Sequence, residues 1–319
     1  MLHSPAPFHK ILVATDFSDH ARVALNQAVS LAKLYGASLT LMHVARDVRA
    51  AVEVMTFGAA GGLVTGKLDS IEEDVRSDSD ERLQQLVAEC RVAGVTADCQ
   101  TRVGTPFIQL IQQVQSQGFD LVIAGTHGQS AARRFWVGST AGKLVRKCPS
   151  AVWITRADEG AAVGSVLVPC DFSMVSQKAV RVAAALALKA GAELHLLHVF
   201  SLDELPQLMP DTSEVDEEVG RYRRIVRRGA IERLRQCLAE AAIEPRRYTL
   251  HALPGIPWRS IGSAARRLKA DLIVMGAVGR GGLAGLLIGN TAEKVLHTSS
   301  QSLLTVKPDG FVSPVPPVA

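Results

Sequence analysis

The sequence predicts two tandem α/β domains, each built on a parallel sheet that is covered by helices on both faces. Three observations support this prediction. The chain has 319 residues, which is room for two domains of ordinary size. Short strands alternate with longer helical segments, and the strands are apolar throughout, as in a parallel sheet that is buried on both faces. The same motifs also occur twice in the same order.

The repeat spans most of the chain and therefore indicates a duplication. Two copies make a pair of domains and not a solenoid. The first two pairs of segments share one offset and the third pair has a smaller one, which indicates a length difference between the second and fourth strands. The pairs are ILVATDFS at 11–18 with VLVPCDFS at 166–173, LMHV at 41–44 with LLHV at 196–199, and GTHGQSAARRFWVGST at 125–140 with GAVGRGGLAGLLIGNT at 276–291.

This duplication sets the expected domain limits. We predict a first domain over residues 1–158 and a second over 159–319. The polar segment at about 157–164 is the expected linker, and the Pro-rich end at about 308–319 is expected to be a flexible tail.

Five strands are expected in each domain, at the apolar runs between turn signals. In the first domain they are 11–15, 38–44, 97–103, 121–125 and 150–156, and in the second they lie near 165–170, 193–199, 246–252, 271–275 and 301–306.

Start and stop signals place the helices between these strands. Ser18 is an N-cap candidate for the helix after the first strand, and Gly36 suits its C-terminal stop. Pro106 suits the first turn of another helix. An acidic segment at about 71–93 predicts a further helix, and residues 45–70 are expected to form a long loop.

A glycine-rich segment after the fourth strand has the features of a phosphate site. Gly125, Gly128 and Gly138 allow an anion to approach the main chain closely. Ser139 and Thr140 then start a helix, whose unpaired N–H groups attract phosphate. The alternative is that these glycines only relieve steric crowding between a strand and a helix.

The strand ends place further residues beside this segment. Ligands of a doubly wound sheet bind where the winding direction reverses. If the first strand is central and the fourth lies beside it, Asp16 and Gly125 face one crevice, and the second strand ends at Val44 on the same edge. A nucleotide fits there with its base near Asp16 and Val44. The alternative for Asp16 is a helix cap.

Composition excludes several other classes of function. A net charge of +4 is too small to indicate a specific nucleic-acid partner. Five scattered cysteines form no pattern of metal ligands and fit a reducing cytoplasm. No apolar run is long enough for a membrane span, so we expect a cytoplasmic protein. No catalytic constellation lies near the glycines, which favours a protein that is not an enzyme, or at most a slow one.

Taken together, these motifs resemble the universal stress protein family. The residues that carry the resemblance are the first strand ending in T-D-F-S, the second ending in L-x-H-V, the G-x-P before the third helix, and G-x-x-G with nine residues before G-S/T. The tandem layout is similar to that of the E-type members. The resemblance implies Rossmann-like, HUP-type domains with strand order 3-2-1-4-5. We also expect the terminal strand edges to meet about a pseudo-two-fold axis as an intrachain pseudo-dimer, with further homodimerisation left open.

For the site, the resemblance implies binding of ATP, AMP or ADP, with any Mg²⁺ held by the phosphates. In the first domain it implies a site of Ala14, Thr15, Asp16, Val44, Gly125, Thr126, His127, Gly128, Gly138, Ser139 and Thr140. The counterparts in the second domain are Pro169, Cys170, Asp171, Val199, Gly276, Gly279, Gly289, Asn290 and Thr291.

Two departures from the family pattern lower the expectation for the second site. Cys170 replaces Thr15, and Asn290 replaces the usual Ser or Thr. Three hypotheses follow. The chain is a stress-response regulatory module that binds nucleotide chiefly in its first domain, a binding protein for an apolar or lipid-like ligand through its second domain, or a slow ATPase that could autophosphorylate at Ser139 or Thr140.

Overall fold

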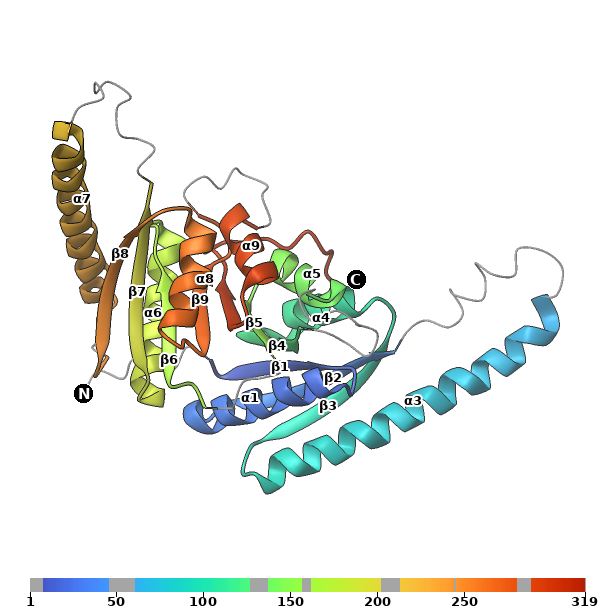
Figure 1. Cartoon of the computed structure of the whole chain (residues 1–319). Helices are drawn as coiled ribbons and strands as arrows, with labels where there is room; N and C mark the ends of the chain where they lie inside the picture. The colour runs from blue at the N-terminus through green and yellow to red at the C-terminus, as the bar shows by residue number, and fades with distance from the viewer. Residues whose placement is uncertain are drawn as a thin grey trace. The chain divides into compact units, whose positions relative to one another are not determined.

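The chain divides into two compact units (Figure 1). The first domain consists of Phe8–Ala157 together with Val312–Ala319, and the second consists of Asp158–Phe311. The computed structural model describes residues 8–45, 61–126, 137–156, 162–201, 213–243, 245–279 and 288–318.

The first domain has a parallel sheet with the strand order β3-β2-β1-β4-β5. The predicted order and the central place of the first strand are therefore confirmed. The elements in chain order are β1 (Lys10–Thr15), α1 (Asp19–Tyr35), β2 (Ser38–Ala45), α3 (Gly61–Val92), β3 (Ala97–Val103), α4 (Pro106–Gln117), β4 (Leu121–Gly125), α5 (Ser139–Lys147) and β5 (Ala151–Thr155).

The second domain repeats this topology, with the order β8-β7-β6-β9-β10. Its elements are β6 (Ser165–Pro169), α6 (Met174–Ala190), β7 (Glu193–Phe200), α7 (Ser213–Glu240), β8 (Tyr248–Pro254), α8 (Pro257–Arg267), β9 (Leu272–Gly276), α9 (Asn290–Thr298) and β10 (Ser302–Val306).

The central strands form the core of each domain. In β1, Ile11, Leu12 and Val13 are fully buried, which fits the continuous apolar run of a strand covered on both faces. In the first domain, α1 lies beside α3, where Arg22 forms an ion pair with Glu89, and α4 packs against α5. Figure 1 shows these two helix pairs on opposite sides of the sheet. In the second domain, α6 contacts α7 and α8 contacts α9.

The expected helix signals are present at α1. The Ser18 hydroxyl accepts a hydrogen bond from the Ala21 amide, and Gly36 ends the helix in the left-handed conformation with φ 68°. Only one expectation for the helices needs correction. Helix α3 begins at Gly61, so the loop predicted for 45–70 is wrong from that residue onward. Residues 46–60 lie outside the described residues.

The C-terminal tail contacts helix α4 of the first domain. Val315 is buried, and its carbonyl accepts a hydrogen bond of 3.0 Å from the Gln115 side chain. The carbonyl of Pro316 accepts a bond of 3.2 Å from Gln112. The tail that its proline content led us to expect as flexible is therefore held at these residues.

A pair of histidines, one buried and one half-buried, predicts that the second domain loses stability in acid. His195 Nδ1 lies 3.4 Å from His251 Nε2, and His195 Nε2 lies 3.8 Å from Glu193. Burial lowers the pKa of both histidines below 6.5, and for His251 the neighbouring His195 and Arg267 lower the pKa further. The unfolded chain therefore binds protons first, so stability is complete above about pH 6.5 and falls as the pH drops toward the lowered values.

This prediction can be checked with the residues that occupy the same strand positions in the first domain, Thr40 and Gln100. We expect the thermal midpoint of the wild-type second domain to fall between about pH 7.5 and about pH 5.5. The double variant His195→Thr/His251→Gln should lose less over the same interval. Equal losses in the two proteins would contradict the assignment.

Candidate functional site at the carboxyl ends of the strands

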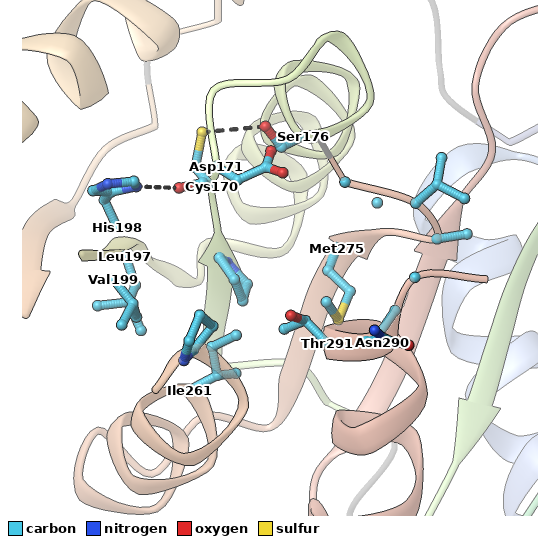
Figure 2. A pocket seen from close by; sticks show the side chains of 18 residues that line it. Cys170, Asp171, Ser176, Leu197, His198, Val199, Ile261, Met275, Asn290 and Thr291 are labelled. Atoms are coloured by element: carbon cyan, nitrogen blue, oxygen red, sulfur yellow. Dashed lines mark hydrogen bonds between the residues drawn. The ribbon is translucent and has the colours of Figure 1, made fainter. Parts of the chain in front are cut away.

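A crevice with a volume of about 420 Å³ opens in the second domain (Figure 2). It lies where β6, β7 and β9 end and where α9 begins, which is the place that a doubly wound sheet offers to a ligand. The residues that the sequence predicts for the second site all line it, namely Pro169, Cys170, Asp171, Val199, Gly276, Gly279, Gly289, Asn290 and Thr291.

One end of the crevice is the N-terminus of α9. Gly289 is its N-cap residue and makes no side-chain cap, so Asn290 and Thr291 start the helix without one. The Gly289 amide donates to the Ala277 carbonyl at 2.7 Å, which fixes the helix start against the end of β9. Uncapped amides at a helix start, together with the positive end of the helix dipole, favour an anion.

The first domain repeats this helix start. Gly138 is the N-cap of α5, again without a side-chain cap, and its amide donates to the Thr126 carbonyl at 2.6 Å. Ser139 and Thr140 open the helix. The Thr126 side chain is buried and donates to the Thr155 carbonyl at 3.2 Å, so its hydroxyl is used within the fold. The predicted residues His127 and Gly128 lie outside the described residues.

The Asp-Phe-Ser turn after the first strand of the second domain also lines the crevice through Asp171, and the first domain has the same turn. Asp171 Oδ1 accepts hydrogen bonds from the amide and the hydroxyl of Ser173, at 3.0 and 2.6 Å. Asp16 makes the same bonds with Ser18, at 3.1 and 2.6 Å. Both serines are the N-caps of their helices, so the aspartates hold the turn and are not the caps themselves.

The Asp171 carboxylate also reaches the glycine segment. A Cβ atom added at Gly279 would lie 2.7 Å from Asp171 Oδ2, closer than van der Waals contact allows. A Cβ atom at Gly289 would lie 3.4 Å from the Gly279 amide nitrogen. The fold thus brings Asp171, Gly279 and Gly289 together, and a side chain at position 279 would force the Asp171 carboxylate to shift.

A different steric contact explains why β4 and β9 each end in a glycine. A Cβ atom at Gly125 would lie 2.7 Å from the main-chain oxygen of His20 in α1. At Gly276 it would lie 2.8 Å from Val175 Cγ1. Helix packing therefore requires glycine at Gly125, which is the alternative that the sequence left open.

Cys170 keeps the local role of Thr15. The Phe17 amide donates to Thr15 Oγ1 at 3.1 Å, and the Phe172 amide forms a hydrogen bond with the Cys170 sulfur. Burial raises the pKa of the Cys170 thiol, so it stays protonated at neutral pH. The replacement of Thr15 by Cys170 therefore preserves the turn in which the aspartate lies.

Histidines on the neighbouring strands support the same turns. His43 Nδ1 donates to the Thr15 carbonyl at 2.9 Å, and His198 Nδ1 donates to the Cys170 carbonyl at 2.8 Å, as Figure 2 shows for the second pair. Neither ring is needed as a ligand to explain its position.

Sequence reasoning missed the phenylalanines of these turns. Phe17 and Phe172 have φ values of 63° and 66°, in a region that costs about 1–3 kcal/mol for a residue other than glycine. The occurrence of Asp-Phe-Ser in both repeats was the available signal. Sequence reasoning also missed the crevice residues Met275, which lies in β9, and Ile261, whose helix α8 comes over the site only through the tertiary fold.

The strained backbone at Phe172 predicts which of two variants at this position is the more stable. Phe172→Ala should lose the ring and keep the strain, whereas Phe172→Gly should lose the ring and relieve the strain. We therefore expect the glycine variant to be more stable by about 1 kcal/mol, measured as a higher thermal midpoint. Phe200, which lies in strand β7, is the control, and there alanine should be the more stable variant. The same order at both positions would contradict the strain.

The fold and the crevice define a class, a tandem α/β protein with a ligand-sized crevice at the strand ends. The model of the Universal stress protein family matches residues 7–156 and 163–307, and the chain belongs to this family. A universal stress protein of Mycolicibacterium smegmatis is 29% identical, covering 93% of this chain and 97% of the relative. Universal stress protein E of Photorhabdus laumondii is 26% identical, covering 97% and 98%. The tandem E-type layout expected from the sequence is thus confirmed.

Solved structures support the fold over the whole length. A functionally unknown protein of Pseudomonas aeruginosa has a TM-score of 0.64 at 24% identity, covering 95% of this chain and 93% of that one. A universal stress protein from Archaeoglobus fulgidus has a TM-score of 0.63 at 19% identity, covering 93% and 96%. Both comparisons confirm the tandem Rossmann-like architecture.

The described part of the chain contains neither a cluster of metal ligands nor a membrane-spanning helix. Its His, Cys, Asp and Glu side chains form no group of three or more that could hold a metal ion. Within the same residues, every helix is too short or too polar to cross a membrane.

Proposed function

We propose that this chain binds an adenine nucleotide, ATP, ADP or AMP, and acts as a regulatory module in a stress response. The observation that carries the proposal is the uncapped start of α9, which lines a crevice of about 420 Å³ together with Asp171. Pockets of this volume suit small molecules and cofactors.

The lining of the crevice suits the two ends of a nucleotide. Val199, Ile261 and Met275 supply apolar contact for a base, and the Asp171 carboxylate can accept hydrogen bonds from base or ribose. Asn290 and Thr291 offer amides and side-chain donors to phosphate. Any Mg²⁺ would be held by the phosphates, because the described residues provide no group of metal ligands.

We propose the same mode of binding for the first domain, through Asp16 and the start of α5. This domain offers Ser139 where the second offers Asn290, and a hydroxyl is the residue type that the family pattern has there. The first site is therefore the proposed principal site. Turnover would be absent or slow, because Asp16 lies at the base and ribose end, away from the position of a γ-phosphate.

The experiment is calorimetry of the purified chain with ATP, ADP, AMP and adenosine, with and without Mg²⁺. Gly138→Asp and Gly289→Asp would each place a carboxylate at one helix start, so each should remove one of two binding events. Acid extraction followed by chromatography would identify any nucleotide that co-purifies. An absence of binding heat for every nucleotide would refute the proposed function. ATP hydrolysis that persists unchanged in both variants would place any turnover elsewhere.

A second candidate is an apolar or lipid-like ligand in the second domain. It is favoured by the apolar side chains at the crevice, which include Leu197, Val199, Ile261 and Met275. Displacement of an environment-sensitive fatty-acid probe by ATP would support a shared site with nucleotide preference. Probe binding that ATP cannot displace, and that Met275→Glu removes, would favour this second candidate instead.

A further inference from the structure

An arginine, a phenylalanine and a histidine form the same stack in both domains. In the first domain, the Arg82 guanidinium carbon lies 4.0 Å from the Phe17 ring centroid, and the His43 ring centroid lies 4.6 Å from it. In the second domain, the corresponding distances from Phe172 are 4.1 Å to Arg233 and 4.4 Å to His198.

Each stack adjoins the aspartate at the base end of the crevice. The phenylalanine directly follows Asp16 or Asp171, and the histidine donates to the carbonyl of the residue directly before that aspartate. The aspartate is thus fixed from the residue on either side, and its own Oδ1 is held by the serine of the turn. The third member of each stack is the guanidinium of Arg82 in α3 or of Arg233 in α7.

The left-handed phenylalanine needs such support. This backbone conformation is unfavourable for a residue with a side chain, so it persists only where surrounding contacts enforce it. A guanidinium over an aromatic ring is an attractive contact of known geometry. Leu83 and Leu234, the residues next to the two arginines, are fully buried and anchor their helices at this level.

Arg82 also has a charge contact within its own helix. Arg82 lies 3.8 Å from Asp78 in an exposed ion pair, an arrangement that contributes little. The stack recurs in the second domain although the neighbouring residues differ. Cys170 and Cys237 occupy the positions that Thr15 and Leu86 have in the first domain. Recurrence with changed neighbours favours a role for the stack itself.

We propose that Arg82 and Arg233 are positioning residues for the base and ribose end of the two sites. Each holds its phenylalanine, and through it the adjacent aspartate, without touching the ligand. This inference rests on the proposed nucleotide function. It also means that α3 and α7, the helices that carry these arginines, are mechanically linked to Asp16 and Asp171.

The test compares adenosine with inorganic tripolyphosphate as probes, because the first uses the base end and the second uses the helix start. In the variant Arg82→Gln/Arg233→Gln, adenosine affinity should fall about fivefold to tenfold, while tripolyphosphate affinity stays unchanged. The variant Arg82→Lys/Arg233→Lys keeps a cation over the ring and should recover most of the affinity. Arg227→Gln/Arg235→Gln removes the same charge from exposed positions of α7 and should leave both affinities unchanged.

Amide hydrogen exchange without any nucleotide provides an independent readout. The amides of Phe17, Phe172 and Ser173 should exchange about fivefold faster in the glutamine variant than in the wild type and the charge-matched control. Should the wild type bind neither probe, the nucleotide function fails, and the exchange rates still decide the positioning role. Unchanged exchange at these amides, or an equal loss of adenosine and tripolyphosphate affinity, overturns the inference.

Discussion

Gly279→Ala should weaken nucleotide binding by the second domain about 10-fold to 100-fold. The new Cβ atom would lie 2.7 Å from Asp171 Oδ2, and the carboxylate cannot simply rotate away because Ser173 holds its other oxygen. Overpacking of this kind costs about 1–3 kcal/mol, and here the cost falls on the group that faces the ligand. Calorimetry on a protein that also carries Gly138→Asp would measure nucleotide binding at the second site alone.

The matched control is Gly229→Ala on the exposed face of α7. No atom lies within 4 Å of the added Cβ there, so binding should stay unchanged and the helix should become slightly more stable. Nucleotide binding by Gly279→Ala that equals binding by this control would show that Asp171 and Gly279 do not form the site together.

Gly125→Ala should destabilise the first domain by about 3 kcal/mol. The added Cβ would lie 2.7 Å from the main-chain oxygen and 2.8 Å from the carbonyl carbon of His20, so strand β4 and helix α1 would have to separate. Thermal unfolding followed by circular dichroism would show this as a lower midpoint for one of two transitions.

The equivalent change in the second domain provides the comparison. At Gly276 the nearest atom is Val175 Cγ1 at 2.8 Å, which belongs to a side chain, and the next is the Val278 carbonyl oxygen at 3.1 Å. Gly276→Ala should therefore cost less, and Val175→Ala should recover part of the loss. A Gly125→Ala protein as stable as the wild type would remove the steric explanation for this glycine.

The duplication made most of the fold predictable. A strand that is apolar throughout fits a parallel sheet that helices cover on both faces. Because each strand pattern occurs twice in the same order, the patterns are not accidental. The start of α3 was the exception, because Gly61, Gly62 and Gly66 disfavour a helix and suggested a loop.

The site was predictable where it depends on residues at strand ends and helix starts. All nine residues predicted for the second domain line one crevice, because parallel strands bring their carboxyl ends to a common edge. Ile261 and Arg233 could not be found this way. Their places depend on how helices α8 and α7 pack, and local sequence patterns do not encode that packing.

The burial of Val315 bears on how this protein could be cut into separate pieces. A fragment that stops after residue 157 lacks the segment Val312–Ala319, although the structure groups that segment with the first domain. Such a fragment would expose the patch of α4 around Gln112 and Gln115 to water. A self-sufficient first half therefore has to include the chain's last residues, for example through a circular permutation that joins them to Phe8.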